Sequence, residues 1–545
     1  MEECEWQTLS PARWRWRTLA CCLILGTAAL HIAYLACNCP LDLAPDEAHY
    51  WDWSRKLDWS YYSKGPLVAY LIRAGCELFG AWSRALTGTD MLAVRMPAIL
   101  CGSLLLLSLY VLTVQVSRRE SLGAVVVLLA LTLPLIAVGS SLMTIDAPYT
   151  CCWGWALVAG HRAIFRGSTW AWPLTGLLIG LGVLAKYTMI LWVPSLVLFL
   201  LTSPQQRRLV ARPGFWAMLA VAALCCLPVV VWNARNDWVS LRHVSGLAGL
   251  SERSAGVRWL GPVAFVGVQF LLLLGYWFVA WLRAMAAHAP WREPRPELRY
   301  LWWMSAPTFV VFLLFGFKTG GGEPNWPVTA YVSGLVLTVL WLARHLETAH
   351  EGERHAALVF LGLACGLGVA LTLIMHRSTW AHPLLAQLAG PPTADAPLPL
   401  RRFDPTCRLR GWRTLATAVD SVRAELRAEG VEPVLAGAGW SLPGILGFYC
   451  EGQPVVYSFG LALGDRRSQY DFWRPNPVWD HEQFAGKTFV FVGGDSLQGL
   501  SGAFAEVATP FIVTHYEGGQ PVSRWTVTVC RGYRGFPVMQ HDHHF

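Results

Sequence analysis

Residues 46–66 concentrate the side chains that could do chemistry. They contain the adjacent carboxylates Asp46 and Glu47, a group of Trp and Tyr residues that includes Tyr61, and then Lys64. A carboxylate here could deprotonate or orient an attacking hydroxyl or amine, and a lysine could neutralise a phosphate. Aromatic rings suit both the headgroup level of a bilayer and the faces of sugar rings. The stretch therefore predicts chemistry on a phosphorylated sugar that is held by a lipid.

Asp46 and Glu47 also have a purely structural interpretation. Acidic residues in the first turn of a helix interact favourably with its dipole, and a helix that begins near Ala48 would place the pair there. However, an acidic pair at a membrane surface is costly without a partner, a ligand or a reaction. The aromatic residues and Lys64 that follow favour the functional interpretation.

Asp146 is the next candidate. It lies in a turn over residues 143–148 that enters an apolar segment from the predicted outer face. There it could hold Lys64 in place or share a polar pocket with it, or it could cap the helix, with Pro148 in the first turn. Lys186, between two apolar segments, is a weaker phosphate candidate, because a lysine at a segment end commonly extends its amine to the interface.

A third group of candidates lies in the loop over residues 318–327. Its three consecutive glycines let backbone N–H groups approach an anion closely. A tight loop between helices would explain the glycines and prolines without any ligand. It would not explain the four side chains predicted to contact substrate: Lys318, Glu323, Asn325 and Trp326.

The need for a metal stays open. Asp46, Glu47 and Asp146 could bind a divalent cation through oxygen ligands, but Lys64 could make a cation unnecessary. The histidines near the end of the chain, residues 541–544, fit a solvated tail better than a metal site.

Membrane helices must position these residues. The 545 residues are 54% hydrophobic and 14% charged, with 29 Trp, a composition far from that of a soluble protein. Roughly 20 apolar residues cross the hydrocarbon core as a helix. Eleven runs qualify: 18–38, 97–116, 121–139, 147–165, 171–186, 188–203, 214–232, 260–282, 300–317, 326–343 and 356–375.

Arginines in alternate loops predict the orientation. A cytoplasmic N-terminus makes every predicted inner loop basic, as the positive-inside rule requires. Residues 39–96 and the C-terminal region then lie on the outer face of a multi-pass protein of the plasma (inner) membrane. The net charge of +8 is modest, and we interpret it as the signal that orients the chain in the membrane. No nucleic-acid-binding motif accompanies it.

The chain changes character after the last apolar run. Residues 377–400 are rich in proline and alanine and predict a linker between a transmembrane domain, 1–376, and a C-terminal domain, 401–545. The second domain alternates predicted strands with a helix, which indicates a small α/β fold outside the membrane. The predicted strands are 431–436, 455–457, 488–492 and 525–529, and the predicted helix is 442–449.

The motif Asp46-Glu47-Ala-His-Tyr50, followed by Tyr61-Tyr-Ser-Lys64-Gly-Pro66, resembles the first extracytoplasmic loop of GT-C membrane glycosyltransferases. The group it resembles is the bacterial protein-mannosyltransferase and aminoarabinose-transferase superfamily, glycosyltransferase family 39 and its relatives. Segments around Asp146 and Lys186 and the loop over residues 323–327 are similar to further features of that group. One departure is Gly65-Pro66, where relatives usually have Pro-Pro after the lysine.

The resemblance implies an inverting transferase that uses a polyprenyl- or dolichyl-phosphate sugar. It places Asp46 at the reaction centre, Lys64 on the lipid phosphate with Tyr61 beside it, and Asp146 in association with that lysine. The fold it implies is mainly α and polytopic, GT-C-like, with about eleven transmembrane helices and the small C-terminal α/β domain.

The predicted function is the transfer of a single sugar from a polyprenyl-phosphate donor to an acceptor of the cell envelope, either a glycolipid of the lipopolysaccharide type or a protein. Two alternatives remain. One is a transporter or flippase of lipid-linked sugars, although the charged candidates cluster at one face rather than at mid-membrane. The other is a ligase or polymerase that transfers whole glycans.

Overall fold

The computed structural model describes residues 11–37, 39–248, 256–493 and 499–536, and the chain divides into two compact units. The first, here called the helical unit, comprises Met1–Tyr34, Met96–Asp237 and Val244–Thr372. The second, here called the loop–sheet unit, comprises Leu35–Arg95, Trp238–His243 and Leu373–Phe545. The predicted first outer loop thus groups with the C-terminal residues.

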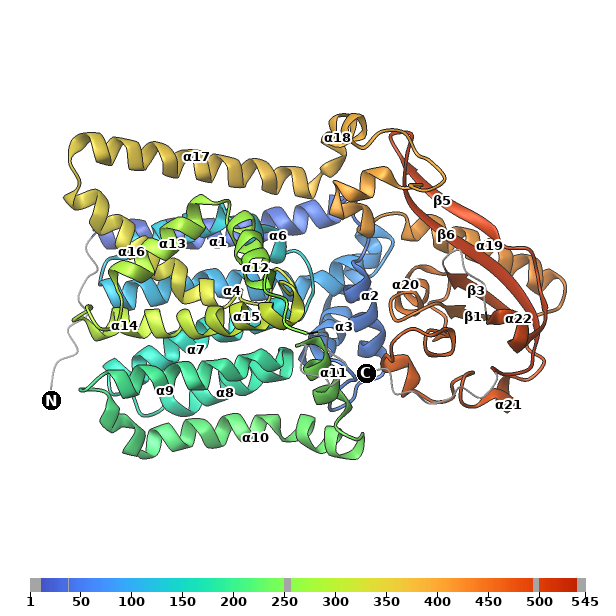
Figure 1. Cartoon of the computed structure of the whole chain (residues 1–545), viewed down its shortest axis with the longest axis horizontal. Coiled ribbons are helices and arrows are strands. Elements are labelled where there is room, and N and C mark those ends of the chain that lie inside the picture. The colour runs from blue at the N-terminus through green and yellow to red at the C-terminus, as the bar shows by residue number, and fades with distance from the viewer. Residues whose placement is uncertain (1–10, 38, 249–255, 494–498, 537–545) are drawn as a thin grey trace. The chain divides into compact units, whose positions relative to one another are not determined.

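The helical unit is built from helices that follow the apolar runs of the sequence (Figure 1). They are α1 (Pro11–Cys37), α4 (Met91–Ser117), α5 (Glu120–Leu131), α6 (Pro134–Gly139), α7 (Asp146–Phe165), α8 (Ala171–Ala185), η1 (Tyr187–Leu191), α9 (Trp192–Thr202), η2 (Arg207–Ala211), α10 (Pro213–Arg235), α11 (Val239–Leu247), α12 (Gly261–Leu272), α13 (Tyr276–Ala287), α14 (Pro296–Trp303), α15 (Ala306–Thr319), α16 (Ala330–Thr348) and α17 (Glu351–His376). Helices α1, α4, α11 and α17 continue into the loop–sheet unit.

Several of the predicted runs are interrupted, and in two of them the residues responsible are clear. Pro134 starts α6 just after α5 ends, because a proline lacks the N–H that a helix interior needs. Helices α12 and α13 meet at an angle of 111°, and between them Leu274 and Gly275 have positive φ values of 56° and 65°. Backbone in this left-handed region ends a right-handed helix.

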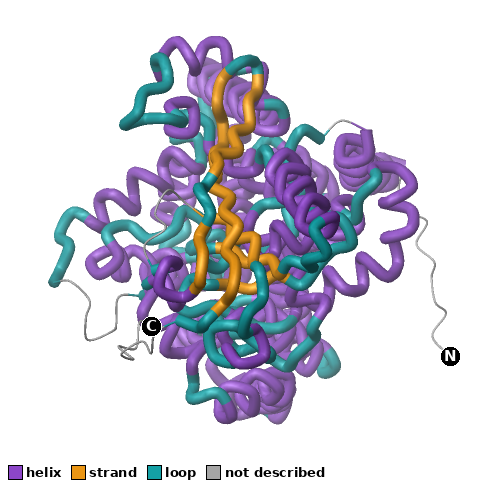
Figure 2. Tube along the Cα trace, turned by 90° about the vertical axis from the view of Figure 1, so that its right-hand side faces the viewer, coloured by secondary structure: helices purple, strands orange, loops and turns teal. Residues whose placement is uncertain are grey.

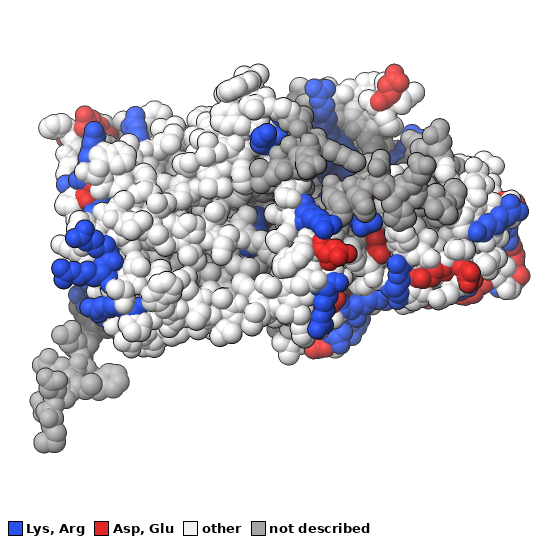
Figure 3. All heavy atoms as spheres, turned by 60° about the horizontal axis from the view of Figure 1, so that its bottom comes forward, with Lys and Arg blue, Asp and Glu red and all other residues white. Residues whose placement is uncertain are grey.

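The prediction of about eleven spans is not confirmed. Among the described residues, five helices are long and apolar enough to cross a membrane: Arg13–Cys37, Met91–Ser117, Pro213–Arg235, Pro296–Thr319 and Glu351–His376. The bent pair α12–α13 would make a sixth. Other predicted runs form shorter apolar helices, such as the 15-residue α8. Figure 3 shows a broad face with few charged side chains, and a group of Lys and Arg at the left-hand end of the view.

Glycines allow close helix packing inside the helical unit. Helix α8 packs against both α7 and α10, and the three lie side by side in Figure 1. A Cβ atom built on Gly176 of α8 would lie 2.2 Å from the carbonyl oxygen of Met218 on α10. A Cβ atom on Gly180, one turn later, would lie 2.3 Å from Cβ of Cys225. Small residues at such crossings let two backbones approach, as is typical of membrane helices.

The loop–sheet unit contains two helices of the first outer loop, α2 (Pro45–Arg55) and α3 (Leu67–Thr87), and a six-stranded mixed sheet. The strand order is β2-β1-β3-β6-β4, and β5 pairs with β6. Strand β1 is parallel to β2 and β3, and β6 is antiparallel to β3, β4 and β5. Figure 2 shows the strands as one continuous layer. Their bounds are β1 (Val434–Gly437), β2 (Val456–Ser458), β3 (Phe489–Gly493), β4 (Phe504–Val507), β5 (Phe511–Glu517) and β6 (Gln520–Tyr533).

The predicted α/β character of the C-terminal region is confirmed, and the region contains more helices and strands than the sequence predicted. The helix predicted over 442–449 is α20, and the four predicted strands overlap β1, β2, β3 and β6. The long helix α19 and strands β4 and β5 were not predicted. The remaining helical elements are η3 (Ser378–Trp380), α18 (His382–Ala389), η4 (Pro399–Arg402), η5 (Pro405–Leu409), α19 (Trp412–Ala428), α20 (Leu442–Tyr449), η6 (Leu461–Leu463), η7 (Gln469–Asp471), α21 (His481–Phe484) and α22 (Leu500–Ala503).

The proline- and alanine-rich stretch predicted as a linker is partly helical. Residues 377–400 contain η3 and α18 and the start of η4. Leu400 packs with Cys407 and Val522 in a small hydrophobic cluster, so the stretch is part of the loop–sheet unit.

Candidate functional site

A buried ion pair fixes the start of α2. Glu47 is 0% exposed and accepts hydrogen bonds from Arg95, at 2.8 Å from Nη2 and 3.0 Å from Nε. Its Oε2 also accepts the backbone N–H of Ala44 at 2.8 Å, which satisfies a free donor at the helix N-terminus. Arg95 Nη2 donates to the carbonyl oxygen of Asp42 at 2.8 Å. These bonds give Glu47 a structural role, in line with the helix-start interpretation.

Asp46, in the same turn, is exposed. Tyr50, one turn later, donates its hydroxyl hydrogen bond to Asp46 at 3.4 Å. Surrounding protein atoms displace enough water to raise the pKa of Asp46 above its ordinary value, although the charges of Lys64 and Arg466 and the Tyr50 hydrogen bond oppose the rise. The nearby charge of Glu47 adds to it. A carboxyl group with a raised pKa is better suited to accept a proton near neutral pH.

Tyr61 supports the segment that carries Lys64. Its hydroxyl donates to the carbonyl oxygens of Trp53 and Lys56, both at 3.1 Å, and its ring stacks on Trp53 at 4.3 Å. Its own N–H donates to the carbonyl oxygen of Lys64 at 3.2 Å. Because Tyr61 is 0% exposed, the structure favours a supporting role over the predicted substrate contact. The side chain of Lys64 is half-buried.

The neighbouring Tyr62 was not among the sequence candidates. Its ring is 2% exposed and lies 4.8 Å from the ring of His243. Its hydroxyl has no hydrogen-bond partner in the part of the chain that the structure describes. A buried hydroxyl without a partner is costly, which makes it a candidate to bind a ligand.

Arg466, from the loop before η7, was also missed. It is exposed, and its guanidinium lies 5.3 Å above the ring of Trp440. Burial lowers the pKa of His243, the charges of Lys64 and Arg466 lower it further, and it comes to about 3. His243 is therefore neutral at physiological pH. Nothing in the sequence spacing relates Arg466 to Asp46, which lies 420 positions earlier.

Asp146 pairs with Lys186 in the helical unit. Lys186 Nζ lies 2.8 Å from Asp146 Oδ1, and Asn325 Nδ2 donates to Oδ2 at 2.5 Å. Lys186 Nζ also lies 5.4 Å from the centre of the Tyr149 ring. Lys186 is 9% exposed, so the expectation that it extends to the interface is wrong. Both oxygens of Asp146 are engaged by residues other than Lys64.

The four residues predicted to contact substrate in the loop over residues 318–327 have different surroundings in the structure. Asn325 joins Asp146, as described above. Trp326 packs its ring 5.6 Å from Phe312 and closely covers Gly322, which favours internal packing over sugar stacking. Glu323 is exposed and Lys318 is half-buried, and no described contact links either of them to Asp146.

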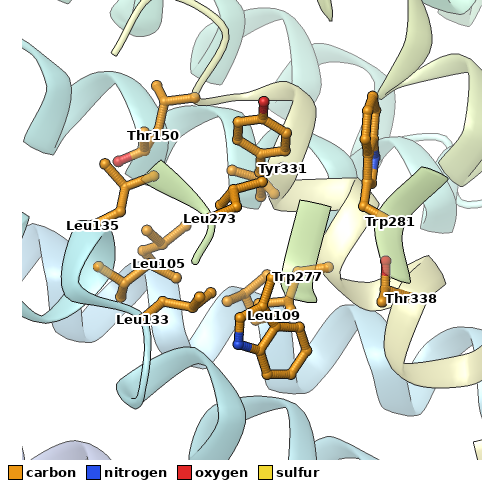
Figure 4. Close-up of a pocket in the computed structure, with 14 residues that line it drawn as sticks. Leu105, Leu109, Leu133, Leu135, Thr150, Leu273, Trp277, Trp281, Tyr331 and Thr338 are labelled. Carbon is orange, nitrogen blue, oxygen red and sulfur yellow. The ribbon is translucent and has the colours of Figure 1, made fainter. Parts of the chain in front are cut away.

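An apolar hollow lies between helices of the helical unit (Figure 4). Its unfilled space and the open solvent at its mouth together amount to about 590 Å³. Leucines such as Leu105, Leu109 and Leu133 line it together with the aromatic side chains Trp277 and Trp281, and the side chains in Figure 4 surround the space from several helices. Such a surface suits a hydrocarbon chain.

One group of possible metal ligands lies within the described residues, and it has another explanation. His382, Asp404 and Cys407 are all buried, with ligand atoms within 4.8 Å of one another. His382 Nε2 already bonds Asp404 Oδ2 at 2.8 Å, and Oδ1 accepts the N–H of Thr406 at 2.8 Å. Because both carboxylate oxygens are bonded, we interpret the group as structural. The histidines over residues 541–544 lie outside the described residues.

Comparisons with known sequences find similar proteins. Residues 63–232 match the family described as dolichyl-phosphate-mannose-protein mannosyltransferase. The lipid A galacturonosyltransferase RgtD of Rhizobium johnstonii is 32% identical over 302 residues, which cover 55% of this chain and 60% of that protein. An undecaprenyl phosphate-alpha-4-amino-4-deoxy-L-arabinose arabinosyl transferase of Pseudomonas aeruginosa is 28% identical over 361 residues, covering 61% and 62%. The chain spans about three fifths of the length of these relatives.

The fold is similar to a crystal structure of ArnT from Cupriavidus metallidurans bound to undecaprenyl phosphate. The TM-score is 0.57 at 17% identity, and the match covers 94% of this chain and 98% of that one. This likeness confirms the expected fold class, a mainly helical membrane protein with a small C-terminal sheet. Together with its apolar helices, it identifies the chain as a multi-pass membrane protein.

Proposed function

We propose that the chain is a membrane glycosyltransferase of the GT-C superfamily, and that it transfers a single sugar from a polyprenyl-phosphate donor to an acceptor of the cell envelope. The observation that carries the proposal is the placement of Asp46, an exposed carboxylate on a rigidly anchored helix start, within the electrostatic reach of Lys64. A base and a phosphate-binding cation are the two groups that this reaction needs.

The proposed step is a direct displacement. The acceptor oxygen or nitrogen attacks the anomeric carbon of the sugar from the face opposite the phosphate, and a new glycosidic bond forms as the bond from carbon to phosphate oxygen breaks. Asp46 takes the acceptor proton, and Lys64 stabilises the charge left on the polyprenyl phosphate. Attack from the opposite face inverts the anomeric configuration.

The remaining candidates have supporting roles in this proposal. Glu47 and Arg95 hold α2, Tyr61 holds the Lys64 segment, and Asp146 with Lys186 and Asn325 forms a separate polar group in the helical unit. Lys318 and Glu323 remain second-rank candidates for substrate contact, and Trp326 is assigned to packing. The apolar hollow of the helical unit would accommodate part of the polyprenyl chain.

The acceptor and the orientation belong to the same proposal. One relative is named for transfer to lipid A, which favours a glycolipid acceptor of the lipopolysaccharide type over a protein. In this proposal the donor phosphate and the loop–sheet unit lie on the outer face of the plasma (inner) membrane, and the N-terminus is cytoplasmic. Lys64 supplies the positive charge at the phosphate, and the carboxylate of Asp46 offers oxygen ligands of the kind that a divalent cation binds.

The test uses purified protein in nanodiscs with a panel of radiolabelled undecaprenyl-phosphate sugars and membrane extract as the source of acceptor. We expect wild type to consume one donor, and Asp46→Asn to lose at least about 100-fold of that rate, the usual contribution of a general base. Lys56→Met serves as a control, because Lys56 lies over Trp473 and its charge is not among the main influences on the pKa of Asp46.

Two results would contradict the proposal. Full activity of Asp46→Asn would remove its assigned role. Tight binding of a donor that wild type never consumes would favour the alternative of a transporter or flippase.

A further inference from the structure

A C-terminal segment, residues 464–472, is bonded to the first outer loop. Gln469 Oε1 accepts the backbone N–H of Tyr62 at 2.7 Å. The hydroxyl of Tyr470 lies 3.4 Å from Nδ1 of His49, which is one turn after Asp46 on α2. These contacts fix the segment beside the residues proposed to carry the reaction.

Arg466 projects from this segment with its donor groups available. Its guanidinium lies 5.3 Å above the Trp440 ring, and that ring lies 5.4 Å from the ring of His49. Arg466 is exposed and makes no ion pair in the described parts of the chain. Stacking on Trp440 restricts the plane of the guanidinium, which lowers the entropy lost when it binds a ligand.

The buried hydroxyl of Tyr62 has no hydrogen-bond partner among the described residues. The positive charge of Arg466 lies close enough to this hydroxyl to act on its pKa. A planar guanidinium presents paired N–H donors that match the two oxygens of a phosphate or a carboxylate. A nearby hydroxyl supplies a further donor. The arrangement is thus suited to an anion.

Resting on the proposed function, we infer that Arg466 and the Tyr62 hydroxyl form, beside Lys64, a binding position for anionic oxygens of the lipid-linked donor. The C-terminal residues thereby contribute directly to substrate binding. The anionic oxygens belong either to the donor phosphate or to a carboxylate on the donor sugar, and the two sources make different predictions.

The first measurement is the Kd of undecaprenyl phosphate for the full-length protein in nanodiscs. If Arg466 binds the phosphate, we expect Arg466→Gln to weaken binding about tenfold or more, since a charge-assisted hydrogen bond contributes about 1.5–3 kcal/mol. Arg466→Lys should restore part of the affinity, and Trp440→Leu should weaken it less than Arg466→Gln does.

The second measurement compares KM for two donors, one with a hexuronic acid and one with a neutral hexose. If Arg466 binds a sugar carboxylate, Arg466→Gln leaves the Kd of undecaprenyl phosphate unchanged. It then raises KM for the uronic acid donor alone, with little change in kcat.

A matched control comes from the same unit. Arg474 is exposed and its guanidinium lies 5.5 Å above the Trp479 ring, but its charge is not among the main influences on the pKa of Asp46. Arg474→Gln should leave Kd and KM at wild-type values. The inference is overturned if Arg466→Gln leaves both quantities within twofold of wild type, or if Arg474→Gln lowers affinity equally.

These outcomes are separate from the proposed function. Undecaprenyl phosphate binding requires no transfer, so the Arg466 inference can fail while Asp46→Asn still abolishes activity. Conversely, a wild-type protein that binds donors through Arg466 but consumes none would refute the transferase alone.

Discussion

At the residue scale, two adjacent carboxylates have different surroundings, and we propose different roles for them. Glu47 is completely buried against Arg95, whereas Asp46 remains exposed with a raised pKa. Removing one partner of a buried pair such as Glu47–Arg95 typically costs about 3–5 kcal/mol, so this pair belongs to folding. The side chain left available for proton transfer is Asp46.

The pH dependence of transfer should report the charges around Asp46. A base must be deprotonated, so the rate should fall as pH drops through the pKa of Asp46, which lies above its ordinary value. Lys64 and Arg466 hold that pKa down, while Glu47 raises it and Tyr50 donates a hydrogen bond. Lys64→Met removes a cation and should move the acid limb of the kcat profile to higher pH.

This measurement requires saturating donor, because Lys64→Met also weakens donor binding. Lys56→Met is the control and should leave the acid limb in place. An acid limb that Lys64→Met leaves unmoved would show that Asp46 is not the group that titrates.

At the scale of elements, close packing fixes helices within each of the two units. Helix α2 is held from the C-terminal side by α20, where a Cβ atom on Gly444 would lie 2.7 Å from the carbonyl oxygen of Ala48. Helix α8 is held by α10 through Gly176. Neither glycine has a positive φ, so each is required by the close approach of a neighbour rather than by backbone conformation.

Gly176→Ala should therefore destabilise the protein. Its methyl group would overlap the backbone of α10, and overpacking of this kind costs about 1–3 kcal/mol. We expect a lower Tm in detergent. Gly366→Ala on α17 is the control, since a Cβ there meets nothing within 4 Å. Equal Tm values for the two variants would contradict the close packing of α8 on α10.

At the scale of the whole molecule, the loop–sheet unit constrains the topology. It gathers Leu35–Arg95, Trp238–His243 and Leu373–Phe545 into one compact body. Contacts such as the ion pair of Asp42 with Arg413, 3.2 Å apart, join its first and last segments. We propose that this unit lies outside the membrane. A compact body there lies on one side only, so the chain is then expected to cross the membrane an even number of times between consecutive segments of the unit.

Reporter fusions would test this constraint. Alkaline phosphatase, which is active only outside the cytoplasm, should be active when inserted after Gly88 or fused to the C-terminus. It should be inactive when inserted after Arg118 or His350, in the loops that precede α5 and α17. Opposite results at Gly88 and the C-terminus would show that the two segments lie on different sides.

The sequence alone determined the features that are local in the chain. Apolar runs predicted the positions of the helices, and the cluster from Asp46 to Lys64 predicted the first outer loop. The number of spans was not determined, because broken helices such as α12–α13 keep the composition of one run while their backbone turns by 111°.

The pairing of charged residues was decided by the tertiary structure. Asp146 was expected to hold Lys64, yet it binds Lys186, 40 positions later, and Asn325, 179 positions later. Arg466 and Arg95 were not predicted at all. Helical and strand periods relate only neighbouring residues, whereas the partner of a charge is chosen by the cost of burying it unpaired, which depends on how distant segments pack.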